Sequence, residues 1–138
     1  MVIINGEKSD KETVISGIPQ GTVFGPLLII RYINDLLDDI ESIGFLFAGD
    51  TKLLREITKK IDALSLQDDI MKLEKWSYDW LLKFNPKKCH VLTLGKFENI
   101  MYTHRYRVYD KEIEHVDIEK DLGVFMDSEL LFHEHMMK

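Results

Sequence analysis

Residues 43–57, which read IGFLFAGDTKLLREI, decide the fold of this chain. The first six residues are almost entirely apolar, a pattern typical of a strand buried on both faces. Gly49 and Asp50 interrupt that run, and extended character then resumes. A two-residue connection that begins with glycine favours a type II′ β-hairpin, because glycine tolerates the positive φ that this turn requires. The stretch therefore predicts a buried hairpin with one carboxylate, Asp50, at its tip. Taken alone, that carboxylate is typical of an ordinary turn.

Length, composition and charge restrict the classes of protein that this chain can represent. With 138 residues, 45% hydrophobic and 30% charged, it is expected to form one soluble globular domain. The formal net charge of −6 argues against unaided binding to nucleic acid, which needs clustered lysine and arginine. The single cysteine, Cys89, excludes an internal disulfide and fits a reducing compartment. No signal peptide or membrane span is visible, so we expect an intracellular protein, cytoplasmic or nuclear.

Hydrophobic periodicity predicts two helices and several strands. One helix is expected over residues 26–37, with Pro26 at its start, and a stronger one over residues 65–84, with Ser65 as its N-cap. A hairpin is expected to join residues 2–4 and 12–15 through a longer loop. Further strands are expected over residues 89–94, 102–109, 113–118 and 122–126, and a helix is expected to start at 128. The predicted class is α+β with a mainly antiparallel sheet.

Four blocks of this sequence resemble conserved blocks of one enzyme family, in the same order and at the same spacing. They are SGIPQGTV (16–23) with YINDL (32–36), FAGDTKL (47–53), LEKW with WLLKFNPKKC (73–76 and 80–89), and EKDLGV (119–124). Together they resemble the reverse transcriptases of non-LTR (LINE-type, jockey-like) retrotransposons and cover most of the chain. The second block is similar to the family's catalytic FADD hairpin, and the last to its primer-gripping segment.

The resemblance implies a fold and a reaction. Residues 1–126 would be part of a polymerase palm, and residues 127–138 the truncated start of a thumb or C-terminal helix. The fingers and the upstream catalytic strand would be missing. The implied activity is RNA-directed DNA polymerisation on an RNA template with a DNA primer. Two Mg²⁺ ions would clamp the attacking and leaving oxygens, held by three aspartates.

The resemblance also implies the site residues. Asp50 would be the remaining catalytic and metal-binding aspartate. The implied substrate-binding residues are Ser16, Gly17, Pro19, Gln20, Gly21 and Lys88. The two glycines would let the backbone approach the nucleotide closely, and Gln20 would lie near the template base or sugar. Lys88 would lie near the triphosphate and balance charge on the leaving pyrophosphate.

Two departures from the family pattern predict that this chain has no polymerase activity. Position 49 is glycine where the family has the first aspartate of the pair, and the chain begins 15 residues before Ser16, without the upstream aspartate. Each loss removes charge stabilisation of several kcal/mol, which corresponds to a factor of roughly a thousand in rate. The alternative is a non-catalytic module that binds nucleic acid or protein. A further alternative is a polymerase completed by another chain, against which Gly49 argues.

Three surface features have ordinary and functional interpretations. Trp76 and Trp80 are expected in the core, with stacking on bases as the alternative. The lysines at 83, 87, 88 and 96 are expected to form a solvated rim, with contact to a nucleic-acid backbone as the alternative. Without the upstream strand, residues 43–48 would present an unpaired apolar edge, so we expect marginal stability and self-association.

Overall fold

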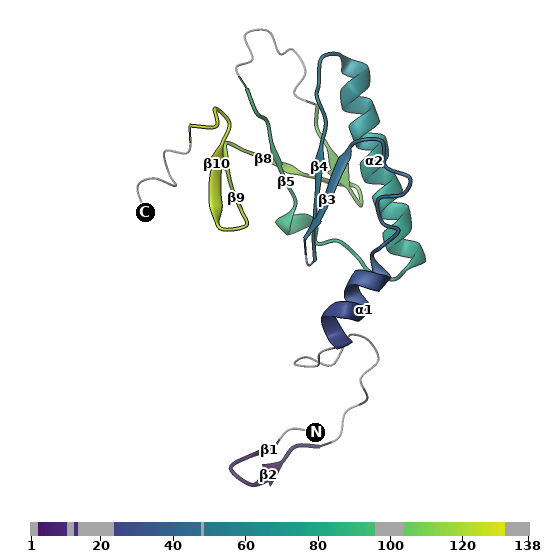
Figure 1. Ribbon diagram of the computed structural model, residues 1–138, viewed down its shortest axis with the longest axis vertical. Helices are drawn as coiled ribbons and strands as arrows, with labels where there is room; N and C mark the ends of the chain where they lie inside the picture. The colour runs from purple at the N-terminus through teal and green to yellow at the C-terminus, as the bar shows by residue number, and fades with distance from the viewer. Residues whose placement is uncertain (1–2, 11–12, 14–23, 48, 96–103, 132–138) are drawn as a thin grey trace. The chain divides into compact units, whose positions relative to one another are not determined.

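The computed structural model describes residues 3–10, 13, 24–47, 49–95 and 104–131 (Figure 1). By its internal contacts the chain divides into two compact units, residues 1–34 and residues 35–138. Both helices and strands are present, and four of the five strand pairs in the described ranges are antiparallel. The predicted α+β class is therefore confirmed. No helix in the described part of the chain is both long and apolar enough to cross a membrane.

The first unit contains a short hairpin and one helix. Strand β1 (Ile3–Ile4) pairs antiparallel with β2 (Glu7–Lys8) through Asn5 and Gly6, whose φ values are 52° and 87°. Residues 3–4 thus pair with residues 7–8, because Asn-Gly is itself the strongest short signal for a two-residue hairpin turn. Residues 12, 14 and 15 of the strand expected opposite them lie outside the described residues. Helix α1 (Phe24–Tyr32) begins before Pro26 and ends five residues before the predicted 37.

The second unit begins with a hairpin followed by the longest helix. Strand β3 (Ile43–Phe47) pairs antiparallel with β4 (Asp50–Leu54), and α2 spans Lys60–Asp79. The prediction that α2 starts at an N-cap on Ser65 is wrong. The Asp62 carboxylate accepts hydrogen bonds from the backbone N–H groups of Thr58 (2.9 Å) and Lys59 (2.7 Å), which starts the helix earlier. These bonds also lower the pKa of Asp62.

The remaining elements are short. A 3₁₀ turn, η1 (Pro86–Lys88), leads into β5 (His90–Leu92). The other strands are β6 (Arg107–Val108), β7 (Lys111–Glu112), β8 (Glu114–Val116), β9 (Ile118–Asp121) and β10 (Val124–Asp127). The strands expected over 102–109 and 113–118 are broken up by turns, one of which places Tyr109 and Asp110 at positive φ. Residues 128–131 are not helical, and the rest of the helix expected from 128 lies outside the described residues.

Helix α2 and the C-terminal strands enclose a small core. Its buried members are Ala63, Tyr106, Val108 and Ile113, with Cys89 among the half-buried residues packed against them. Burial raises the pKa of the Cys89 thiol and of the Tyr106 hydroxyl. Cys89 is therefore a half-buried thiol at the edge of this core. The β5–β8 pair is parallel and joins two segments more than twenty residues apart in sequence.

Candidate functional site

The tip of the β3–β4 hairpin holds the predicted catalytic residue, Asp50. Its register pairs Phe47 with Asp50, so the connection consists of residues 48 and 49, and Asp50 is the first residue of β4. The predicted Gly49-Asp50 connection is therefore wrong by one residue, and glycine is not the first loop residue. A Cβ built at Gly49 would meet no atom of the described residues within 4 Å. None of the described residues near this position demands that the side chain be absent.

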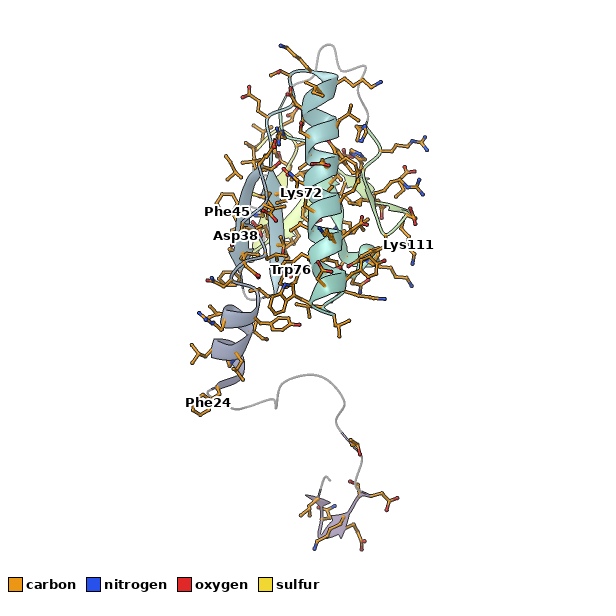
Figure 2. All side chains as sticks on the ribbon, turned by 90° about the vertical axis from the view of Figure 1, so that its right-hand side faces the viewer. Phe24, Asp38, Phe45, Lys72, Trp76 and Lys111 are labelled. Atoms are coloured by element: carbon orange, nitrogen blue, oxygen red, sulfur yellow. The ribbon has the colours of Figure 1, made fainter. Side chains whose placement is uncertain are left out.

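The hairpin has one open face and one half-buried face. The side chains of Ile43 (59% exposed), Phe45 (53%) and Phe47 (61%) share the open face with Asp50 and Lys52 of the neighbouring strand. Figure 2 shows Phe45 on the side of the hairpin away from α2. The prediction that β3 is buried on both faces is wrong, because the described strands form only a two-stranded sheet here. The carboxylate of Asp50, the predicted catalytic residue, therefore lies on a mainly apolar, open surface.

A buried carboxylate on α2 fixes the start of this hairpin. Asp69 is fully buried and accepts hydrogen bonds from the Ser42 N–H (2.8 Å), the Ser42 hydroxyl (2.6 Å) and the Glu41 N–H (3.1 Å). Burial by itself would raise the pKa of Asp69, but these bonds and one from Lys72 (3.1 Å) lower it below its usual range. Because Ser42 directly precedes β3, the helix and the hairpin are tied together at this point.

The end of the hairpin is tied to the same carboxylate. Arg55, directly after β4, places its guanidinium 3.4 Å from Asp69 and 3.3 Å from the Ser42 hydroxyl. This cluster was not predicted, because a helix that starts at Ser65 would place Asp69 in its first turn. With the observed start at Lys60, Asp69 falls on the buried stripe between Leu66 and Leu73, a spacing that could have revealed it.

Two side-chain contacts connect β9 to β4 and β5. Lys52, two residues beyond Asp50 on the same face, pairs with Asp121 at the end of β9. His90 on β5 places Nδ1 2.9 Å from the Glu119 carboxylate, also on β9. Residues 119–124, which resemble the primer-gripping segment, are thus attached to the hairpin that carries Asp50. The Asp121 carboxylate is engaged by Lys52.

The residues at the hairpin tip do not fit a site for two divalent ions. Mg²⁺ is bound by hard oxygen ligands, and a two-ion site needs several converging carboxylates. Asp50 faces Phe47 across the strand pair, and position 49 supplies no side chain. In the ranges that the structure describes, no group of three or more His, Cys, Asp or Glu side chains could hold a metal ion.

The other predicted site residues are only partly placed. Ser16, Gly17, Pro19, Gln20 and Gly21 lie outside the described residues. Lys88 is exposed at the end of η1, where its backbone N–H donates to the Asn85 carbonyl (2.9 Å). The Asn85 side chain in turn accepts from the Lys87 N–H (3.1 Å). The roles implied for all these residues stay predictions.

The two tryptophans stack on each other. The ring centroids of Trp76 and Trp80 are 6.0 Å apart with an interplanar angle of 29°. Trp76 is half-buried and donates its Nε1–H to the Asp35 carboxylate (2.9 Å), whereas Trp80 is 42% exposed. The expectation of a core position holds in part for Trp76 and is wrong for Trp80, because α2 ends at Asp79 and leaves Trp80 outside the packed stripe.

Comparison with known proteins decides the family. The family described as "Reverse transcriptase (RNA-dependent DNA polymerase)" matches residues 1–119 of the 138. The chain belongs to the reverse transcriptase family. It is also 26% identical, over 148 aligned residues, to the RNA-directed DNA polymerase from mobile element jockey of Drosophila melanogaster. That match covers 98% of this chain and 16% of the jockey protein.

Other curated relatives point to the same kind of element. The probable RNA-directed DNA polymerase from transposon X-element of Drosophila melanogaster is 29% identical over 93% of this chain and 14% of its own length. The one from transposon BS is 27% identical over 99% of this chain and 16% of its own length. This reverse transcriptase chain thus spans about a sixth of the length of these non-LTR relatives. No solved structure matches it significantly.

Reverse transcriptases generally bind a nucleic-acid template and use divalent metal ions. The resemblance stated from the sequence blocks is therefore confirmed at the level of the family.

Proposed function

We propose that this chain is the palm portion of a non-LTR reverse transcriptase in which the catalytic hairpin no longer supports nucleotidyl transfer. The observation that carries the proposal is the hairpin tip, where Gly49 and Phe47 surround a single exposed aspartate, Asp50. In this proposal residues 1–126 belong to the palm and residues 127–138 begin the next subdomain. The template would be RNA, the growing strand DNA, and the ancestral metal Mg²⁺.

The chemistry explains why so few carboxylates are insufficient. In nucleotidyl transfer, metal ions stabilise the charge that develops on the attacking 3′-hydroxyl oxygen and on the leaving pyrophosphate. A lone exposed carboxylate binds a divalent ion weakly, because most of the ion's ligands must then come from water. Losing several kcal/mol of transition-state stabilisation slows the reaction by roughly a thousandfold or more.

The surroundings of Gly49 support the view that the glycine is a change in the site and not a requirement of the fold. The Cβ of an aspartate at this position would have no described atom within 4 Å apart from its chain neighbours. Such a side chain would stand next to Asp50 at the tip and supply the second carboxylate of the family's FADD pattern. The scaffold is therefore compatible with the residue that the family has here.

Primer extension tests the proposal. The chain, its Asp50→Ala variant and its Gly49→Asp variant are incubated with an RNA template, an annealed DNA primer and Mg²⁺ or Mn²⁺. We expect no product above the Asp50→Ala background for the unmodified chain. Extension by the unmodified chain that disappears in Asp50→Ala would overturn the proposal.

Metal binding gives a second readout that does not depend on activity. Titration with Mn²⁺, followed by the electron paramagnetic resonance signal of the free ion, measures affinity at the tip. We expect Gly49→Asp to bind Mn²⁺ at least about tenfold more tightly than the unmodified chain, because two adjacent carboxylates replace one. Equal affinities for the two proteins would mean that the tip geometry, and not the missing carboxylate, prevents binding.

A further inference from the structure

We propose that β3 pairs through its free edge with β3 of a second copy of this chain, in antiparallel orientation, with Phe45 opposite Phe45 of the other copy. The two hairpins would then form one four-stranded sheet. This inference concerns assembly and does not depend on whether the chain is catalytically active.

The free edge of β3 is the first observation. Strand β3 pairs with β4 on one side, and no other described strand pairs with it on the opposite side. Its five residues thus leave backbone N–H and C=O groups available along one edge. Unpaired edges of this kind are templates for a strand of another chain.

The composition of the edge is the second observation. Residues 42–49, SIGFLFAG, contain no charged residue and no proline. Natural proteins block free edges with charged side chains, proline or β-bulges. Strand β3 contains neither a charged residue nor a proline. Short apolar, uncharged segments with high β-propensity are those that pair with identical copies of themselves.

The register favours a second copy of the same strand. When two β3 strands run antiparallel about Phe45, Ile43 lies opposite Phe47 and Gly44 opposite Leu46. Each exposed residue then meets an exposed residue, and each half-buried one meets a half-buried one. The open apolar faces of the two hairpins would join into one continuous row, and aromatic cross-strand pairs stabilise such sheets. The strand is complementary to itself without any shift.

The other edge of the hairpin explains why pairing would stop at two copies. Strand β4 carries Asp50 and Lys52, and Lys52 is engaged by Asp121 of β9. Charged residues on an edge strand discourage further pairing. A two-fold β3–β3 contact uses the same edge from both copies, so the assembly closes as a dimer.

Sedimentation of the full chain over a range of concentrations tests whether the proposed β3–β3 contact forms. Ile43→Lys places a charge on the edge strand, and Ile61→Lys is the matched control, because the two isoleucines are 59% and 60% exposed. We expect a monomer–dimer equilibrium that Ile43→Lys weakens at least about tenfold and Ile61→Lys leaves unchanged. An unmodified chain that stays monomeric, or equal effects of both variants, would overturn the proposal. Circular dichroism confirms that both variants remain folded.

Disulfide trapping tests the register. In a Cys89→Ser background, Phe45→Cys is expected to cross-link to itself, because directly opposed residues lie about 5 Å apart. Ile43→Cys and Phe47→Cys are expected to cross-link only when mixed, since identical positions would be about 13 Å apart at 3.3 Å per residue. Self-linking of Ile43→Cys as fast as the mixture, or linking to an Ile61→Cys control, would exclude this arrangement.

Discussion

At the scale of single residues, the most consequential side chain of the second unit is Asp69. A fully buried carboxylate is costly unless hydrogen bonds and counter-charges compensate it. Asp69 has both, from Ser42 at the start of the hairpin and from Arg55 at its end. The hairpin that carries Asp50 is therefore held by a charge, and its attachment depends on the protonation state of one residue.

The stability of this attachment is expected to depend on pH. The folded-state pKa of Asp69 lies below its unfolded value of about 4, so its contribution is present above that value and is lost as pH falls through the folded-state pKa. Asp69→Asn is expected to lower the free energy of unfolding at neutral pH by about 3 kcal/mol, because it removes the buried anion that Arg55 and Lys72 approach and leaves them only the more exposed carboxylates of Glu41 and Asp68. The difference between the two proteins should shrink in acid. Urea denaturation at several pH values measures it.

A neighbouring residue provides the control for this experiment. Asp68 is exposed and forms an ion pair with the Lys72 side chain (3.2 Å). Asp68→Asn is expected to change the free energy of unfolding by no more than about 0.5 kcal/mol at any pH. If Asp69→Asn behaved like Asp68→Asn, the buried carboxylate would not hold the hairpin.

At the scale of elements, the hairpin also packs against the turn that precedes it. A Cβ built at Gly44 of β3 would lie only 2.7 and 2.8 Å from the two Cδ atoms of Leu37. The backbone of β3 thus approaches the Leu37 side chain more closely than any other residue type would allow without movement. Leu37 therefore packs directly against the half-buried face of the hairpin.

Substituting the two hairpin glycines should affect stability very differently. Gly44→Val is expected to destabilise the chain by about 1–3 kcal/mol, because Leu37 must move out of its packed position. Gly49→Ala, in open space on the same hairpin, is expected to be nearly neutral. Thermal or urea unfolding of both variants measures the difference. Comparable losses for the two would contradict the close approach at Gly44.

The sequence predicts which helices and strands are present better than it predicts where they begin and end. Apolar runs predicted the β3–β4 hairpin and strand β5, and helical periodicity predicted the long helix. All of these elements are present in the fold. The start of α2 was missed because Asp62 binds backbone N–H groups that precede the helix. The exposure of β3 was missed because an apolar run does not reveal how many strands cover it.

At the scale of the whole molecule, family membership and the position of Asp50 near a hairpin tip were predictable, since sequence blocks carry both. The charge network around Asp69 was not, because it joins residues 27 positions apart that no local pattern connects. Ion pairs such as Lys52–Asp121 are beyond sequence patterns for the same reason.

The acidic balance of the chain should limit its affinity for nucleic acid. The net charge is −6, and Lys52 and Lys72 are paired with aspartates of this chain. Lys87 and Lys88 are exposed at η1. We expect weak RNA binding that falls steeply with salt, with the slope reduced by about one for each of Lys87→Ala and Lys88→Ala. Fluorescence anisotropy of a labelled RNA at several salt concentrations measures this.

The matching control is an exposed lysine away from η1. Lys111→Ala on β7 is expected to leave the salt slope unchanged. Tight binding that persists in high salt would favour the alternative role of the chain as a dedicated nucleic-acid-binding module.

The stacked indoles at the end of α2 have a practical consequence. The chain contains two tryptophans, and both belong to this one pair, so tryptophan emission comes from a single place in the second unit. Because Trp76 is bonded to Asp35, loosening of the segment ahead of the hairpin would shift that emission. The protein thus carries its own optical reporter, and its unfolding can be followed without attaching a dye.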